Sequence, residues 1–148
     1  MAGISIDVQI GDREVRDFLN RRKERAKDLR PAYGSIGEYM LREIEARFAG
    51  EHDPEGGPWT PLSPLTIAKK KTDKILTEDS YLRGDIHYIA TGDHVSIGTA
   101  KVYGAIHQLG GKAGRGKKVT IDARPYLGVN DDNRNEFLEI VKDHILSG

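Results

Sequence analysis

Apolar and polar side chains alternate along residues 3–10 of the chain. The apolar positions are all β-branched: Ile4, Ile6, Val8 and Ile10. Alternation with a period of two, built from β-branched residues, is typical of a half-buried strand. We therefore predict a strand here, ended by Gly11.

Two segments follow in which apolar residues recur every three to four positions. In the first, residues 13–29, the apolar positions are Val15, Phe18, Leu19, Ala26 and Leu29. In the second, residues 32–48, they are Ile36, Met40, Ile44 and Phe48. This spacing is typical of helices with one buried face. Asp12 suits the N-cap of the first helix, and we expect Pro31 to end it.

Residues 51–64 contain four prolines and two glycines, which exclude a helix or a central strand. Trp59, the only tryptophan of the chain, lies in this loop. We interpret it as an anchor that pins the loop onto the core, with a contact to a partner as the alternative. Ser63 and Pro64 suit the start of a short helix that reaches about residue 70.

Strand patterns return in the second half of the chain. Residues 86–90 and 95–99 predict two strands joined by the short connection 91–94. Before them we expect a brief extended piece at 75–77 and a helix or turn at 80–85.

The last third of the chain predicts a short helix, a strand and a long helix. Residues 103–109 carry apolar side chains three positions apart, at Tyr103, Ile106 and Leu109. Residues 119–121 read as a strand, and residues 130–146 as an amphipathic helix whose first turn is acidic.

Residues 110–118 contain four glycines and no apolar side chain larger than that of Ala113. Their four charged residues are all basic: Lys112, Arg115, Lys117 and Lys118. Such a segment cannot bury itself, and we predict a flexible basic loop. Residues 1–148 together predict a single α+β domain. Its N-terminal helices and C-terminal helix pack on a small, mostly antiparallel sheet, with this long flexible loop attached.

Composition narrows the class of protein. The chain has 148 residues, no cysteine and a formal net charge of zero, with basic residues spread along its length. A dedicated nucleic-acid-binding protein usually concentrates positive charge, so this balance argues against one. No run approaches the ~20 apolar residues of a membrane span, and the first residues do not resemble a signal peptide.

No constellation of catalytic residues is evident. Residues 111–118 resemble the start of a phosphate-binding loop, but Lys118 stands where a hydroxyl is needed and a strand follows instead of a helix. The five histidines show no metal-ligand spacing, and no nucleophile elbow is present. Glu43, Glu45, Arg42 and Arg47 read as surface pairs on one helix. We predict no catalytic, cofactor-binding or metal-binding residues.

Two short motifs flank the basic loop. His107 and Gln108 are expected to satisfy backbone groups around the turn at Gly110 and Gly111. After them, Pro125 cannot donate a ladder hydrogen bond, so the strand ends there or lies at an edge. Arg124 is then expected to find a carboxylate, while Tyr126 packs inward. Residues 124–128 form either a structural corner or part of a subunit contact.

The order of these motifs resembles a known family. The motifs are Asp53-Pro54-x-Gly56-x-x-Trp59-x-Pro61-Leu62-Ser63, Leu82-Arg83, Ile97-Gly98-Thr99, Tyr103-x-x-Ile106-His107-Gln108-x-Gly110-Gly111 and Ala123-Arg124-Pro125-Tyr126-Leu127-Gly128. Over residues 33–146 the chain resembles the phage virion morphogenesis family, the tail-completion or neck-type proteins of tailed bacteriophages and prophages.

The resemblance implies a non-enzymatic structural protein that helps complete the tail and join it to the head. It implies an α+β domain that forms a ring with its own copies, located in the virion after synthesis in the bacterial cytoplasm. The implied partners are further copies of the chain, tail proteins and head-connector proteins. It implies no cofactor and no membrane.

From the residues we add a hypothesis about the basic loop. It would settle on an adjacent subunit or line a channel through which packaged DNA passes, with Arg124 and Tyr126 near its base. Two other classes of function stay open. One is a small DNA-binding protein that uses residues 69–71 and the loop, and the other is an uncharacterised enzyme.

Overall fold

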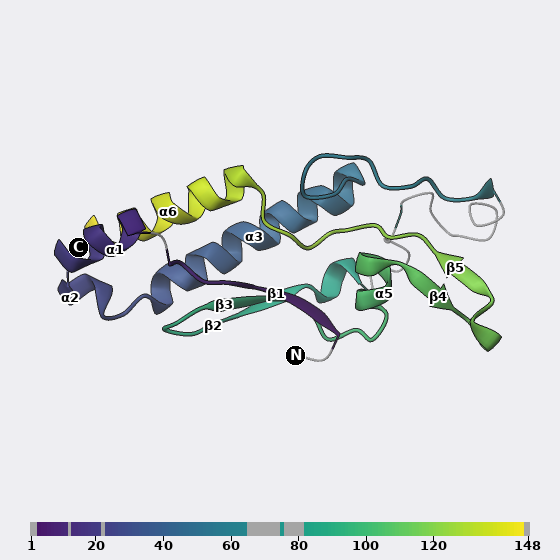
Figure 1. Cartoon of the computed structure of the whole chain (residues 1–148), viewed down its shortest axis with the longest axis horizontal. Helices are drawn as coiled ribbons and strands as arrows, with labels where there is room; N and C mark the ends of the chain where they lie inside the picture. Colours follow the sequence, from purple (N-terminus) through teal and green to yellow (C-terminus); the bar gives the residue numbers. More distant parts are fainter. Residues whose placement is uncertain (1–2, 12, 22, 65–74, 76–81, 147–148) are drawn as a thin grey trace.

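The computed structural model describes residues 3–11, 13–21, 23–64, 75 and 82–146, and it confirms the α+β class. The elements in chain order are β1 (Ile4–Val8), α1 (Arg13–Arg21), α2 (Lys23–Ala26), α3 (Arg30–Gly50), η2 (Arg83–Asp85), β2 (His87–Ala90), β3 (Val95–Thr99), α5 (Gly104–Leu109), β4 (Gly111–Ala113), η3 (Arg115–Lys117), β5 (Val119–Ile121) and α6 (Asp131–Leu146). Figure 1 shows α3 between the three-stranded sheet and α6.

The main sheet has the strand order β1-β3-β2, and both pairs are antiparallel. The predicted hairpin therefore forms, and the N-terminal strand joins its far side, with Ile6 opposite Ile97. Val95 and Ile97 on the central strand have no exposed surface. Alternation along β1 leaves Ser5 and Asp7 exposed, which confirms the predicted half-buried strand.

Helix α3 carries the predicted apolar stripe through the centre of the core. Ile36, Met40, Ile44 and Phe48 are at most 1% exposed. On α6, Phe137, Val141 and Ile145 face them from the other layer and are also buried. The period of the apolar residues was sufficient to predict both helices and both buried faces.

The first helical segment differs from the prediction. Its described parts end at Ala26, and Pro31 does not terminate it. Pro31 instead lies in the first turn of α3, which begins at Arg30. A proline is favourable there because the first N–H groups of a helix have no intrahelical partner. Val15 is buried as predicted, whereas the side chains of Phe18 and Leu19 lie outside the described set.

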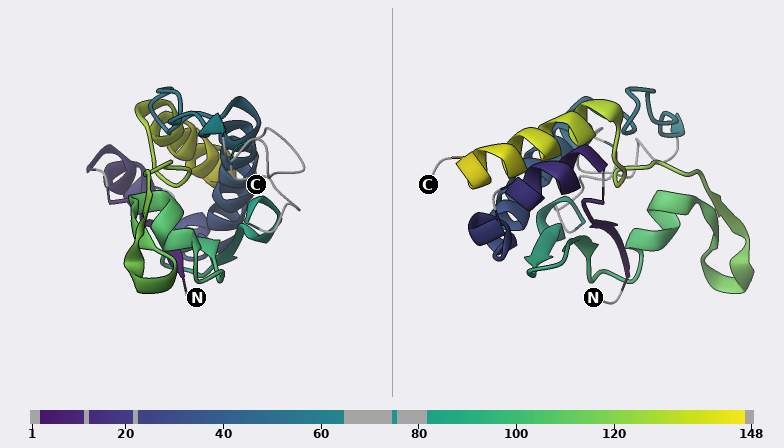
Figure 2. Two further views of the ribbon diagram at one scale, coloured as in Figure 1. Left: turned by 90° about the vertical axis from the view of Figure 1, so that its right-hand side faces the viewer. Right: turned by 60° about the vertical axis from the view of Figure 1, so that its left-hand side comes forward.

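We predicted a flexible loop without regular structure at residues 110–118, but the structure shows regular elements there. Gly111–Ala113 and Val119–Ile121 pair as the antiparallel strands β4 and β5, with η3 between them. Gly114 and Gly116 have φ angles of 80° and 70°, and these left-handed conformations allow the tight reversal. Both views in Figure 2 show this hairpin at the margin of the body, and the right-hand view shows it projecting. Its flexibility stays a prediction.

Other predictions fall on residues that the structure does not describe. They are the short helix through residue 70, the basic run at 69–71 and most of the extended piece at 75–77. Of the turn expected at 80–85, the last three residues form η2.

Candidate interaction site

Trp59 holds the proline-rich loop onto the core. Its side chain is 4% exposed, and its Nε1 donates a 2.7 Å hydrogen bond to the carbonyl oxygen of Pro125. The ring meets Phe48 edge to face, with centroids 5.5 Å apart. These contacts confirm the predicted anchor, and they tie residues 51–64 to the segment that follows the β4–β5 hairpin, which is the one called the hairpin from here on.

The side-chain amide of Gln108 forms hydrogen bonds with backbone groups, as the backbone of a neighbouring strand would. Its Oε1 accepts from the backbone N–H groups of Tyr126 and Leu127 at 3.0 and 2.9 Å, and its Nε2 donates to Leu127 O at 2.8 Å. We predicted that this side chain satisfies backbone groups, but we placed those groups in the turn at Gly110 and Gly111. They belong instead to residues 126–127.

His107 also lies at this junction. Its backbone carbonyl accepts a 2.8 Å hydrogen bond from the N–H of Arg124. Its ring lies edge-on to Tyr103, with centroids 6.0 Å apart. This backbone bond joins the end of α5 to the chain that leaves the β4–β5 hairpin, whereas the predicted role of the His107 side chain in satisfying the turn at Gly110 and Gly111 stays a prediction.

Among the described residues Arg124 binds backbone carbonyl groups and no carboxylate, which differs from our prediction. Its Nε donates to Thr60 O at 2.8 Å and its guanidinium also donates to Pro61 O at 3.2 Å. A guanidinium has several donors and can serve both carbonyl groups. Arg124 therefore links the base of the hairpin to the anchored loop.

Tyr126 is a core residue. It is 0% exposed, its hydroxyl donates a 2.7 Å hydrogen bond to Gly104 O, and its ring lies 5.4 Å from that of Phe48. Burial raises the pKa of Tyr126 above its ordinary value. The inward packing is confirmed, but its assignment to an interaction surface is wrong, because the side chain offers no surface to a partner.

The four basic residues predicted to interact lie together on the projecting hairpin. Lys112, Arg115, Lys117 and Lys118 are all exposed. None of them forms an ion pair with a carboxylate among the described residues. The β4–β5 hairpin thus holds four positive charges that no described carboxylate neutralises.

Exposed apolar side chains gather on the same part of the chain. We call residues 102–121, which comprise α5, the hairpin and the turn before them, the limb. It carries four of the six large apolar side chains that are exposed among the described residues. They are Val102 at 84%, Leu109 at 71%, Val119 at 53% and Tyr103 at 36% exposure. The sequence analysis placed Tyr103 and Leu109 on a short helix but did not predict that they are exposed, so this exposed set was missed.

A buried polar network behind the site was also missed. Arg47 is 2% exposed and donates to Tyr126 O, Gly128 O and Asn133 Oδ1 at 2.9 to 3.0 Å. Asn133 in turn donates to Glu43 and to the hydroxyl of Tyr39. Desolvation lowers the pKa of Arg47. Arg47 and Glu43 are therefore not surface residues that pair in solvent, although Glu45 does pair with an arginine at the surface, Arg83.

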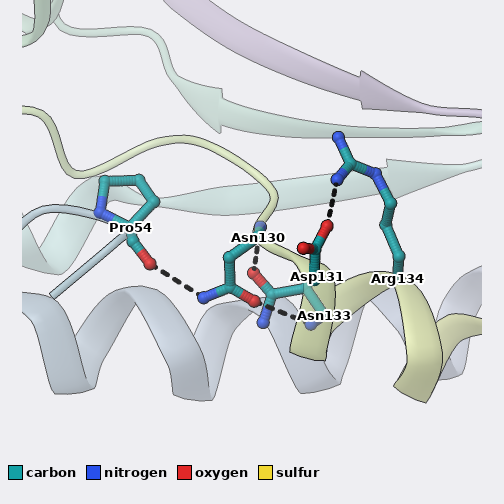
Figure 3. Close-up of polar contacts among 5 residues, drawn as sticks. All are labelled: Pro54, Asn130, Asp131, Asn133 and Arg134. Carbon is teal, nitrogen blue, oxygen red and sulfur yellow. Dashed lines mark hydrogen bonds and ion pairs between the residues drawn. The ribbon is translucent and has the colours of Figure 1, made fainter.

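The first turn of α6 is closed by a reciprocal pair of asparagines, shown in Figure 3. Asn130 Oδ1 accepts from Asn133 N at 2.7 Å, and Asn133 Oδ1 accepts from Asn130 N at 3.0 Å. Asn130 also donates to Pro54 O at 2.8 Å, so the cap is joined to the proline-rich loop. This arrangement satisfies donors that the helix cannot satisfy itself.

The described residues offer little for catalysis. No group of three or more His, Asp or Glu side chains among them could hold a metal ion. An open groove of about 420 Å³ lies between the end of β1 and α6, lined mainly by apolar side chains such as Val8, Ile10 and Phe137. Its charged side chains, Asp7 and Arg134, are both engaged elsewhere, by Ser96 and Asp131. None of the described helices is long and apolar enough to cross a membrane.

Comparison with known proteins agrees with the resemblance noted in the sequence. Residues 10–146 match the phage virion morphogenesis family. The chain is 31% identical to "Mu-like prophage FluMu G protein 2" of Haemophilus influenzae over 94% of its own length and 95% of that protein. It is 27% identical to "Putative capsid assembly protein G" of Escherichia phage Mu over 72% of each chain. No solved structure matches it.

Proposed function

Because the chain belongs to the phage virion morphogenesis family, we propose that it is a non-enzymatic structural protein of the virion that completes the tail and helps join it to the head. It acts as an oligomeric ring of identical copies. Its partners are tail proteins and head-connector proteins, and packaged DNA passes near it without stable binding.

The limb is the observation that supports a role in assembly. It presents exposed basic groups and exposed apolar groups together on one projecting element. Protein interfaces combine apolar anchors with a polar rim, and a contiguous exposed apolar surface marks such interfaces. In contrast, polar side chains buried in the body, such as Arg47 and Asn133, are committed to internal hydrogen bonds.

Electron microscopy of particles from a phage that lacks this gene tests the proposal. We expect separate DNA-filled heads and finished tails, with joining restored when the gene is supplied in trans. Normal infectious virions without the protein would exclude the role.

The name of the phage Mu relative favours a second candidate, a role in capsid assembly. The same micrographs distinguish the two. A role in capsid assembly predicts missing or aberrant heads, whereas a role in joining predicts normal, filled heads that lack tails.

The hairpin has its own test within this function. Replacing Lys112, Arg115, Lys117 and Lys118 by alanine should leave the circular dichroism spectrum unchanged, because all four side chains are exposed. The same variant should fail to restore infectious particles in the deletion phage. Full restoration would show that these charges are dispensable for assembly.

A further inference from the structure

We propose that the limb of one copy docks on the exposed face of helix α6 of the next copy, with the basic hairpin tip over a stripe of carboxylates. The inference rests on the proposed function in one respect, because it assumes that the chain assembles with copies of itself. It identifies the two surfaces that meet, which differ from each other. We call the limb, which inserts, the donor surface, and the face of α6 that receives it the acceptor surface.

The donor surface is the limb. Four positive charges and no negative charge lie within residues 110–121. Val119 and Leu109 are each more than half exposed on the same limb, at 53% and 71%. A projecting element that combines basic and apolar groups fits a partner surface that is acidic and carries an apolar contact of its own.

The acceptor surface is the face of α6 that points away from the core. Asp132, Glu136, Glu139 and Asp143 follow one another at spacings of four, three and four, so they form one stripe. All four are exposed. Over the whole helix, five carboxylates stand against one arginine, one lysine and one histidine.

Most of this stripe has no ion-pair partner among the described residues. Glu139 pairs with Lys142. Asp132, Glu136 and Asp143 form no ion pair with any described residue. Leu146 lies three residues beyond Asp143 on the same face and is 54% exposed, which supplies the apolar contact that Val119 or Leu109 requires.

The placement of the two surfaces decides the symmetry. In Figure 1 the hairpin and α6 lie toward opposite ends of the long axis, so a chain cannot satisfy its own stripe. A contact between two different surfaces of identical subunits is head to tail, and it repeats from copy to copy, giving a ring where the rotation between copies closes. The docking thereby neutralises charges that have no ion-pair partner among the described residues of their own chain.

Cross-linking of single-cysteine variants tests this contact. The chain has no cysteine, so Thr120→Cys on β5 and Asn135→Cys on α6 introduce unique thiols and change no charge. The matched control is Gly92→Cys in the exposed turn between β2 and β3, where an added side chain meets no atom within 4 Å. Two chains, one with a mass tag, are mixed with a short bismaleimide, so a mixed product must join two molecules.

We expect the Thr120→Cys and Asn135→Cys pair to cross-link at least about tenfold faster than the Thr120→Cys and Gly92→Cys pair. Bound neighbours hold their thiols at an effective concentration in the millimolar range. Equal rates for the two pairs would overturn the proposal. A Thr120→Cys chain that couples fastest with another Thr120→Cys chain would also overturn it, because that contact is symmetric.

Charge reversal provides the second arm. Lys117→Glu with Lys118→Glu, or Asp132→Lys with Glu136→Lys, should each reduce the rate to that of the control. A chain that carries all four substitutions should recover a rate near the unsubstituted one, because attraction is restored with reversed sign. Failure of that recovery contradicts the docking.

DNA is the competing partner of the hairpin. One result would show that the tip binds nucleic acid and that the docking is wrong. In it, the four-alanine variant loses the salt-dependent binding to double-stranded DNA that the unsubstituted chain shows, and the Thr120→Cys and Asn135→Cys pair cross-links no faster than the Thr120→Cys and Gly92→Cys pair. The micrographs of the deletion phage report the proposed function separately, so either can fail alone.

Discussion

At the scale of single residues, Arg47 shows how a charged side chain can be central to a core. It lies on the apolar face of α3, three residues after Ile44, and its guanidinium reaches two carbonyl groups of the segment after the hairpin as well as Asn133. These bonds replace the water that the carbonyl oxygens of Tyr126 and Gly128 lose on burial. One side chain thus joins α3, α6 and the crossing segment.

Arg47→Ala should lower the free energy of unfolding by roughly 3–5 kcal/mol, because several buried acceptors lose their donor at once. Arg42→Ala, exposed on the same helix, should change it by less than about 0.5 kcal/mol. Urea denaturation followed by circular dichroism measures both. A loss for Arg47→Ala no greater than for Arg42→Ala would mean that the network adds no stability.

Tyr126 leads to a prediction about pH. Burial raises its pKa above the ordinary 10.0, so the folded state holds the phenolic proton more tightly than the unfolded state. Its contribution to the free energy of unfolding is therefore fully present below pH 10 and is lost as the pH rises above 10. Tyr126→Phe should cost about 1–2 kcal/mol at pH 8, from the lost bond to Gly104.

The same variant should lose less stability than the unsubstituted chain between pH 9 and about pH 11, because it has no proton to release at this position. Urea denaturation at each pH gives the two slopes. Tyr39 and Tyr88, whose pKa values are also raised, contribute equally to both proteins. Parallel slopes would show that Tyr126 is not the group that titrates.

At the scale of elements, the contact between α3 and β2 depends on a glycine. A methyl group on Gly37 would lie 2.5 Å from the ring of Tyr88, and that ring is fixed by its hydroxyl bond to Glu38. Helix and sheet can approach this closely only without a side chain at position 37. Gly34, one turn earlier, faces open space.

Gly37→Ala should therefore destabilise the protein by about 1–3 kcal/mol, although alanine favours a helix, because it overpacks this contact. Gly34→Ala should stabilise it by up to about 1 kcal/mol, since only the helix propensity changes. Thermal unfolding of the two variants measures the difference. Stabilisation by both substitutions would show that the sheet yields to the added methyl group.

The elements also show what a sequence can predict. The apolar stripe of α3 and the alternation along β1 repeat over several turns or residues, and both were predicted correctly. The β4–β5 hairpin was predicted only in part: residues 119–121 were correctly read as a strand, but β4 was not, because it has three residues beside four glycines, which leaves no period to detect.

The candidate site divides in the same way. Trp59 could be predicted as an anchor because burying the large apolar ring against the core is favourable, and a proline-rich loop cannot bury it alone. The partners of Gln108 and Arg124 could not, since hydrogen bonds to backbone groups 18 to 64 residues away leave no local signal. Arg47 had a weak signal, because a charged residue at that position interrupts an otherwise apolar stripe.

At the scale of the whole molecule, stability and interaction are assigned to different parts of the chain. The core runs from Val8 to Ile145 and includes Trp59 and Tyr126, but no residue of the limb. The bonds of Gln108 and Arg124 hold the base of the hairpin, and they lie outside residues 112–120. The hairpin is therefore an addition to a body that is already complete.

This separation predicts the effect of removing the hairpin. Replacing residues 112–120 by Asn-Gly keeps Gly111 and Ile121, which are already paired, and connects them with a two-residue turn. Only exposed or half-exposed residues are lost, so the change should stay within about 0.5 kcal/mol, or roughly 2 °C in the midpoint of thermal unfolding. The shortened chain should at the same time fail to restore infectious particles. Unfolding at a much lower temperature would mean that the hairpin supports the body. An unchanged midpoint with full restoration would mean that assembly uses another surface.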